Sequence, residues 1–180
     1  MRSHTVFGRV SIAVLVVALG SVSARAADPI QTAGTVLQLL LPATAAALTI
    51  GRRDAVGTGQ LAMSLGVSEG LTLALKYSIN ETRPNGGHLS FPSGHTSLSF
   101  ASAEFMRRRY GWTFGAPAYA IAVFVGYSRV ESHEHYVHDV LAGAAVGIIS
   151  SRVFTKPYKH WTASAAGDAR NLRLTLVRSW

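Results

Sequence analysis

The stretch from Ile30 to Ile50 contains no charged side chain over 21 residues. An α-helix needs about 20 predominantly apolar residues to cross the hydrocarbon core of a bilayer, which is about 30 Å thick. Gln31, Gln38 and Pro42 weaken the apolar pattern, but they do not exclude a spanning helix. The stretch therefore favours a fold in which helices lie in lipid.

Four further apolar stretches follow, separated by charged or turn-forming residues. They cover residues 57–77, 93–106, 116–127 and 137–154. Charged residues make up only 14% of the chain, against about 25% in typical soluble domains. We therefore predict an all-α fold, a polytopic membrane helical bundle of about five spans. The second and third of these stretches are short for a full span, so we expect their helices to extend into the flanking residues.

The first 26 residues have the pattern of a signal peptide. Arg2 and Arg9 precede an apolar stretch at 10–19, and a small-x-small cleavage signature follows at 24–26. We expect residues 1–26 to be removed, or to remain as an anchor that makes a sixth span. Either way residue 27 begins outside the cytoplasm of a bacterium. Residues 27–160 then form the inner-membrane domain, and residues 161–180 a basic cytoplasmic tail without regular structure.

The basic residues agree with this orientation. The formal net charge is +8, which in a soluble protein would suggest a nucleic-acid partner. Of the fourteen Lys and Arg residues after residue 26, eleven lie in the breaks and the tail assigned to the cytoplasm. Because this satisfies the positive-inside rule, the charge reflects topology and we expect no nucleic-acid partner. The other three cations, Lys76, Arg83 and Arg129, lie on the outer side.

These outer cations are expected to meet the start of a helix. Pro92, Ser93 and Gly94 precede His95 where the stretch at 93–106 begins. Proline is tolerated at a helix start, serine is a good N-cap, and glycine lets a bound group approach the backbone. The free N–H groups and the positive dipole end of such a helix attract anions. With three cations nearby, this helix start can hold the peripheral oxygens of a phosphoryl group.

His135 and Asp139 supply the remaining chemistry. They are four residues apart, so we expect them on one face of a helix. A carboxylate there accepts the N–H of one ring nitrogen of His135 and leaves the other nitrogen free to attack phosphorus. His95 is then the natural proton donor to the leaving oxygen. The arrangement predicts hydrolysis of a phosphomonoester or a pyrophosphate through a phosphohistidine.

A metal site is the alternative interpretation of the same histidines. The residues that could bind an ion are His133, His135, His138 and Asp139. Their spacing is not His-Glu-x-x-His, and three cations already neutralise a phosphate, so we expect no metal and no other cofactor. The chain has no cysteine, which excludes thiolate ligands. Glu104, a carboxylate within an apolar stretch, is expected to have a structural role.

Three motifs occur in a fixed order along the chain. Their residues are Lys76 with six residues before Arg83-Pro84, then Pro92-Ser93-Gly94-His95, then Ser128-Arg129 with five residues before His135 and three more before Asp139. This pattern resembles the signature of the type 2 phosphatidic acid phosphatase family, which includes bacterial class A acid phosphatases and vanadium haloperoxidases. The link between Pro84 and Pro92 is shorter than in those two groups, which favours access by a lipid headgroup.

The resemblance implies an all-helical core like that of the acid phosphatases and haloperoxidases, with no metal. It implies His135 as the nucleophile, His95 as the general acid and Asp139 as the carboxylate that orients His135. The residues that it implies as phosphate ligands are Lys76, Arg83, Ser93, Gly94 and Arg129.

We therefore expect an integral membrane phosphatase that cleaves a lipid phosphate or lipid pyrophosphate at a site facing the periplasm. Phosphatidic acid, phosphatidylglycerol phosphate, undecaprenyl pyrophosphate and lipid A phosphates are all compatible substrates. Three alternatives stay open at this point. They are a soluble or peripheral acid phosphatase acting on small phosphoesters, a vanadate-binding oxidase, and a phospholipid-binding or transport protein with a degenerate site.

Overall fold

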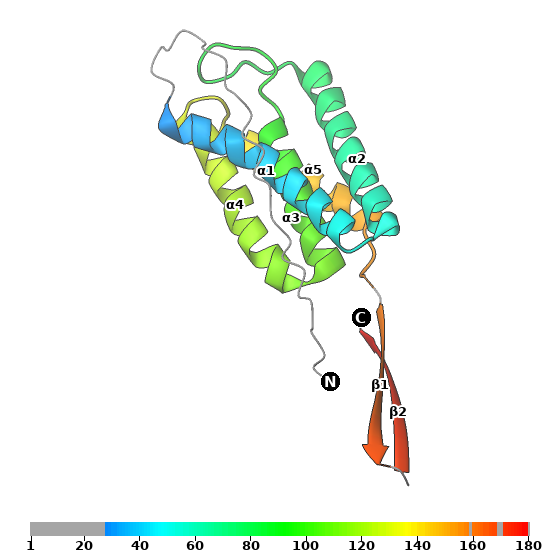
Figure 1. Cartoon of the computed structure of the whole chain (residues 1–180). Coiled ribbons are helices and arrows are strands. Elements are labelled where there is room, and N and C mark those ends of the chain that lie inside the picture. The colour runs from blue at the N-terminus through cyan, green and yellow to red at the C-terminus, as the bar shows by residue number, and fades with distance from the viewer. Residues whose placement is uncertain (1–27, 159, 169–170, 180) are drawn as a thin grey trace.

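The computed structural model describes residues 28–158, 160–168 and 171–179. In these ranges the chain forms five helices that pack into one bundle (Figure 1). The helices are α1 (Pro29–Gly51), α2 (Ala55–Ile79), α3 (Gly94–Tyr110), α4 (Trp112–Glu131) and α5 (Val137–Phe154). Each coincides with a predicted apolar stretch, and the two short stretches extend as expected, so the helical core is confirmed. The expected signal peptide lies outside the described residues.

Capping groups and turns set the helix boundaries. The carboxylates of Asp28 and Asp54 accept backbone N–H groups in the first turns of α1 and α2, at 3.0 and 2.9 Å. Such caps satisfy donors that have no partner within the helix. α2 ends at Asn80, which has a left-handed φ of 48°, and Gly111, with a φ of 88°, turns the chain from α3 into α4. Asparagine and glycine adopt these values more readily than other residues.

Helix α3 lies among the other helices and packs against all four of them (Figure 1). Its buried side chains are mainly serine, alanine and threonine, which let the neighbouring helices approach closely. Two glycines of α5 complete this approach. A Cβ at Gly143 would lie 2.5 Å from the carbonyl oxygen of Ser93, and one at Gly147 would lie 2.2 Å from that of Ser97. The small residues therefore place the start of α5 beside the start of α3.

The interior of the bundle combines a small apolar core around Phe105 and Met106 with many polar side chains, whereas much of the outer surface is apolar. Many serine and threonine side chains are fully buried, whereas the large apolar side chains of Leu39, Ile50 and Val153 are 60–70% exposed. Water-soluble proteins rarely expose contiguous apolar surface on a large scale. Of the described helices, α1 and α5 are long and apolar enough to cross a membrane, judged by length and composition. Spans formed by α2, α3 and α4 stay a prediction.

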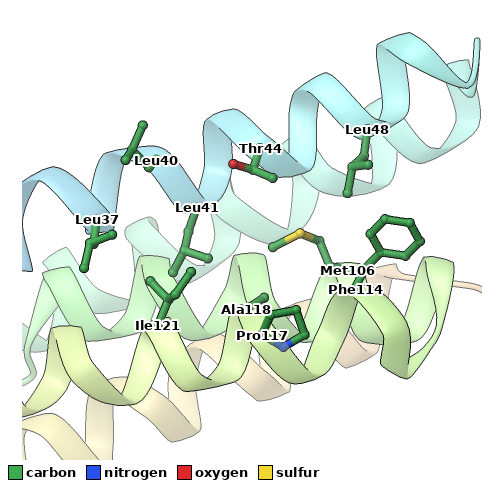
Figure 2. A pocket seen from close by; sticks show the side chains of 10 residues that line it. All are labelled: Leu37, Leu40, Leu41, Thr44, Leu48, Met106, Phe114, Pro117, Ala118 and Ile121. Carbon is green, nitrogen blue, oxygen red and sulfur yellow. The ribbon is translucent and has the colours of Figure 1, made fainter. Parts of the chain in front are cut away.

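An apolar groove of about 370 Å³ lies between α1 and α4 (Figure 2). Its lining is hydrocarbon except for the hydroxyl of Thr44 and the sulfur of Met106, which α3 contributes (Figure 2). The lining residues are Leu37, Leu40, Leu41, Thr44, Leu48, Met106, Phe114, Pro117, Ala118 and Ile121. The groove adds to the apolar character of the outer surface.

The tail differs from the prediction. Strands β1 (His160–Asp168) and β2 (Asn171–Ser179) pair antiparallel as a hairpin, in a register that joins Asp168 to Asn171 and His160 to Ser179. The expectation of a tail without regular structure was therefore wrong, whereas the all-α fold holds for the bundle. Neither segment has a strong alternating apolar pattern, so the sequence of each alone does not predict a strand. Pairing through backbone hydrogen bonds stabilises both.

Candidate active site

The ends of all five helices meet at one end of the bundle, where α1, α3 and α5 start and α2 and α4 finish. Two loops connect the helices there, residues 80–93 and 132–136. Hydrogen bonds tie the start of α1 to the second loop, because Gln31 donates to Glu134 at 2.9 Å and Ser132 donates to Asp28 at 3.1 Å. The eight predicted site residues all lie at this end. They are Lys76, Arg83, Ser93, Gly94, His95, Arg129, His135 and Asp139.

His135 and Asp139 meet, but not on one helix face. His135 precedes α5, which begins at Val137, so the prediction of a shared helix face was wrong. The contact forms because Asp139 caps its own helix. Its Oδ2 accepts the N–H of Tyr136 at 2.8 Å and lies 3.5 Å from Nδ1 of His135. Both side chains are buried, so the carboxylate holds the Nδ1 edge of the imidazole and leaves Nε2 as the other ring nitrogen.

Ser90 is a site residue that the sequence reasoning missed. Its hydroxyl donates to Oδ2 of Asp139 at 2.6 Å, and its oxygen lies 3.4 Å from Nδ1 of His135. The side chain is fully buried. A hydroxyl between the carboxylate and the imidazole fixes both groups. Its place in the turn-rich loop before Pro92 gave no signal, because the two partners lie more than forty residues away in the sequence.

The start of α3 lies against the start of α5 and beneath Lys76. The backbone N–H of Ser93 donates to the carbonyl oxygen of Asp139 at 3.0 Å. Ser93 is the N-cap residue of α3, as expected. Its hydroxyl caps no backbone N–H and instead accepts from the Thr96 hydroxyl at 3.0 Å. A Cβ at Gly94 would lie 3.9 Å from Cε of Lys76. Lys76 therefore lies beside the first turn of α3, and helix-start N–H groups next to a cation favour a bound anion.

Lys76 and Arg129 are held by neutral acceptors. Nζ of Lys76 donates to the carbonyl oxygens of Leu89 and Ser90, at 2.5 and 3.2 Å. The buried guanidinium of Arg129 donates to the carbonyl oxygen of Gln31 at 2.6 Å and also to two hydroxyl groups. Within the described residues neither cation has a hydrogen bond to a carboxylate. Their positive charges are thus oriented without being neutralised by a direct partner.

Arg83 differs, because it has a carboxylate partner. Its Nη1 donates to Oε2 of Glu134 at 2.5 Å, and its Nε donates to the carbonyl oxygen of His88 at 3.1 Å. Sequence reasoning missed Glu134, although its position immediately before His135 could have drawn attention to it. The pair is partly exposed, so an anion that enters the site can compete with Glu134 for Arg83.

Burial and the positive charges of the site disfavour protonation of both His95 and His135. Arg129, Arg83 and Lys76 all lie within electrostatic range of the His95 ring, which is itself in the first turn of α3. The pKa of His135 is lowered to about 4, first by burial and then by the charges of Lys76 and Arg83, while Asp139 acts in the opposite direction. His135 is therefore neutral near pH 7, the protonation state that a nitrogen nucleophile needs.

The metal cluster considered from the sequence is not what the structure brings together. Among the described residues, the acidic and histidine side chains that converge in a group of three are Glu81, His138 and Asp139. His133 is exposed in the loop before α5, with a φ of 55°. Glu104 is fully buried toward the other end of α3, bonded to Arg107, Arg152 and Tyr119, which fits the structural role expected for it.

Known proteins resemble this chain in sequence and in fold. The PAP2 superfamily profile matches residues 57–162, more than half of the chain. A lipid A 1-phosphatase of Porphyromonas gingivalis is 40% identical over 93 residues, which cover 49% of this chain and 21% of that protein. A lipid A 4'-phosphatase of Helicobacter pylori is 30% identical over 138 residues, which cover 70% of this chain and 69% of that protein.

The crystal structure of Aquifex aeolicus LpxE has the same fold, with a TM-score of 0.60 and 26% identity over 71% of this chain and 87% of that one. The chain thus spans about a fifth of the Porphyromonas protein and more than two thirds of the Helicobacter protein. All eight predicted site residues lie within the matched range. The chain belongs to the PAP2 superfamily, the type 2 phosphatidic acid phosphatase family that its three motifs predict.

Proposed function

We propose that this phosphomonoester hydrolase removes phosphate from a membrane lipid through a phosphohistidine at His135. In the first step Nε2 of His135 attacks phosphorus, the bond from phosphorus to the leaving oxygen breaks, and His95 gives its proton to that oxygen. In the second step water attacks phosphorus and gives a proton to His95, the N–P bond breaks, and inorganic phosphate leaves. The observation that carries this proposal is the buried contact of Asp139 and Ser90 with the Nδ1 edge of His135.

The groups around His135 match the charge of a phosphoryl transition state. Lys76 and Arg129 present positive charge that no carboxylate among the described residues neutralises directly, and Arg83 is available by exchange with Glu134. The N–H of Ser93 is already bonded to Asp139. The backbone groups left for a phosphate oxygen are therefore those of the next residues in the first turn of α3, and the Ser93 hydroxyl can donate its own proton.

Apolar surface beside the site supports a lipid substrate. A groove of about 350 Å³ between α4 and α5 is lined almost entirely by hydrocarbon. Its lining includes Val130, next to Arg129, and Val137, two residues after His135. A lipid phosphate bound at the cations can therefore lay its acyl chain against the bundle without leaving the bilayer. Because the relatives include lipid A 1- and 4'-phosphatases, a lipid A phosphate is the first substrate to test.

The charge distribution supports a site on the periplasmic side of the inner membrane. The loops opposite the site and the helix ends beside them hold the clustered basic residues. These are Arg52, Arg53, Arg107, Arg108, Arg109, Arg152 and Lys156. Short loops rich in Lys and Arg remain in the cytoplasm. The end of the bundle that carries His135 then faces the periplasm.

Phosphate release by detergent-purified protein in the presence of EDTA tests the proposal. The panel contains lipid A, phosphatidic acid, phosphatidylglycerol phosphate, undecaprenyl pyrophosphate and a soluble phosphoester. We expect turnover of a lipid substrate that survives EDTA, disappears in His135→Ala and persists in His133→Ala, the exposed histidine of the same loop.

Other outcomes would contradict separate parts of the proposal. Loss of activity in EDTA would indicate metal-dependent chemistry. Hydrolysis of the soluble phosphoester alone would favour a small-molecule phosphatase. Trapping a phosphorylated protein that is acid-labile and absent in His135→Ala would support the phosphohistidine, and its absence under rapid quenching would count against that intermediate.

A further inference from the structure

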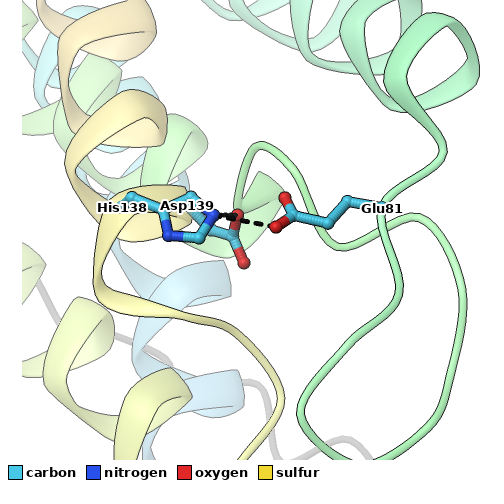
Figure 3. Close-up of side chains that lie close together, drawn as sticks. All are labelled: Glu81, His138 and Asp139. Carbon is cyan, nitrogen blue, oxygen red and sulfur yellow. Dashed lines mark hydrogen bonds and ion pairs between the residues drawn. The ribbon is translucent and has the colours of Figure 1, made fainter.

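Three potential ligand atoms converge on the outer edge of the site. Glu81 lies in the loop after α2, and His138 and Asp139 lie in the first turn of α5 (Figure 3). Nε2 of His138 is 3.0 Å from Oε1 of Glu81 and 3.2 Å from Oδ1 of Asp139. Each residue contributes one atom to a group in which all atoms lie within 4.8 Å of one another. The catalytic scheme above uses neither Glu81 nor His138.

Oδ1 of Asp139 is the second observation that points to a ligand here. Asp139 is fully buried, and Oδ1 has no hydrogen-bond partner among the described residues. His138 lies near it, but the contact does not have hydrogen-bond geometry, and Nε2 of His138 is already bonded to Glu81. A buried carboxylate oxygen without a donor is costly. A cation between the three groups would remove that cost.

The two separations made by His138 are close to those around a small tetrahedral ion, and the Glu81 and Asp139 oxygens lie within 4.8 Å of each other. With metal–ligand bonds of about 2.0–2.2 Å, tetrahedral ligand atoms lie about 3.3–3.6 Å apart. The two separations made by His138, 3.0 and 3.2 Å, need to widen only slightly. One imidazole nitrogen and two carboxylate oxygens are ligands that zinc accepts, whereas Ca²⁺ and Mg²⁺ prefer six or more oxygens. His138 is 58% exposed, so an ion can enter from solvent and keep a water molecule as its fourth ligand.

The three side chains are also held in place before any ion binds. The His138 ring stacks on Tyr136, with ring centroids 5.3 Å apart and planes 8° apart, and on Phe91 at 6.1 Å. Asp139 is fixed through its other oxygen, Oδ2, by the Tyr136 N–H and by Ser90. The carbonyl oxygen of Glu81 accepts the N–H of Ser90 at 2.8 Å, which ties its loop to the same group.

We propose that Glu81, His138 and Oδ1 of Asp139 form an inhibitory site for a divalent transition-metal ion, with Zn²⁺ as the best fit. The inhibition rests on the role proposed above for Asp139. A cation at Oδ1 draws negative charge away from Oδ2, which then holds the Nδ1–H of His135 less strongly. Two carboxylates offset the repulsion from Lys76, whose charge lies within range of Asp139. The phosphatase is thus metal-free when active and is slowed when zinc binds.

Zinc binding and zinc inhibition are measured on the full chain in detergent after chelator treatment and removal of the chelator. Isothermal titration with ZnCl₂ is expected to show one site in the wild-type protein. His138→Gln and Glu81→Gln are expected to weaken binding about tenfold or more, to keep phosphatase activity without zinc, and to raise the zinc concentration for half-inhibition by the same factor. The matched control His133→Gln, in the neighbouring loop, is expected to bind and to be inhibited like the wild type.

Each other result overturns the proposal. Unchanged zinc affinity in His138→Gln would place the ion elsewhere, and no binding at 100-fold excess of zinc over protein would remove the site. Inhibition that is equal in the wild type and in both variants would mean that zinc acts on the lipid phosphate rather than on the protein. The titration does not depend on turnover, so an inactive preparation would count against the proposed function while still testing the metal site.

Discussion

The two ends of the bundle differ in whether their buried charges are paired with opposite charges. Away from the site, the buried carboxylates of the described residues are bonded to arginines. Asp54 accepts from Arg109, and also from the Tyr110 hydroxyl, and Glu104 accepts from Arg107 and Arg152. At the site, Lys76 and Arg129 are buried or half-buried against carbonyl and hydroxyl oxygens. At the first end the buried charges are balanced by the folded chain itself. At the site the positive charges would be balanced only by a bound anion.

Paired charges stabilise the fold, whereas unpaired cations are available to bind an anion. Burial alone would raise the pKa of Asp54, but hydrogen bonds from Arg109, Gly57 and Tyr110 outweigh it, and the pKa lies below its ordinary value. That carboxylate is stabilised in its charged form by the folded chain. At the other end Lys76 and Arg129 have no carboxylate bonded to them among the described residues. In the proposed mechanism an incoming phosphoryl group relieves the repulsion between these two cations and Arg83.

The largest expected effect comes from removing an unmatched cation. Arg129→Met is expected to lower kcat/KM about 10³-fold, because a buried donor to the transferring phosphoryl group is lost. The melting temperature should stay the same or rise, since an uncompensated buried charge disappears. Turnover and thermal unfolding in one detergent measure both quantities. If kcat/KM falls by less than tenfold, or if the melting temperature falls strongly, Arg129 stabilises the fold rather than binding the phosphoryl group.

The second prediction concerns a paired charge at the end of the bundle opposite the site. Glu104→Gln removes a fully buried carboxylate that pairs with the partly buried Arg107 and the exposed Arg152, and is expected to cost about 1–3 kcal/mol of unfolding free energy. Turnover per folded molecule should remain within about twofold to threefold. Glu131→Gln, an exposed carboxylate at the end of α4, is the control and should be nearly neutral. Equal stability of the two variants would contradict the assignment of Glu104 to the fold.

The pH dependence follows from the lowered pKa of His135. Because its pKa lies at about 4, His135 stays neutral and nucleophilic well below pH 6, and kcat/KM should fall only as the pH approaches 4. Burial and the charges of Arg129, Arg83 and Lys76 disfavour the protonated form of His95 before a phosphate binds. We therefore expect the fall at higher pH in kcat, because a bound phosphate offsets these charges and lets His95 carry the proton that it donates, which gives kcat a bell-shaped profile. In Lys76→Met the acidic limb should move to higher pH, because one of the charges that lower the pKa is gone. An acidic limb of kcat/KM near pH 6.5, or a kcat that does not fall on the alkaline side, would contradict these roles.

The smallest expected effect lies at the one site cation with a carboxylate partner. Glu134→Gln removes the charge that competes with phosphate for Arg83, in a pair that is partly exposed. KM should fall about twofold to fivefold, the size of a partly exposed ion pair, with kcat nearly unchanged. Steady-state kinetics decide this, with Glu131→Gln as the control. A rise in KM would mean that Glu134 positions Arg83 for the substrate instead of competing with it.

The sequence determined the five helices and the set of motif residues. Helix positions follow from apolar stretches between charged breaks, which are local properties, and the structure reproduces all five. The motif spacings likewise identify His95, His135, Asp139 and the three cations without reference to packing. These features are readable because each depends on residues that are close together along the chain.

Only the tertiary structure decided which further side chains reach the site. Ser90 meets Asp139 across 49 residues, Arg83 meets Glu134 across 51, and Glu134 meets Gln31 across 103. Such contacts depend on how the helices pack, which local periodicity does not fix. The same holds for His135, which meets Asp139 from a loop and not from a helix face, and for the hairpin at 160–179, whose strands form only as a pair. Local pattern sets the elements, and packing through small residues decides which of their ends meet.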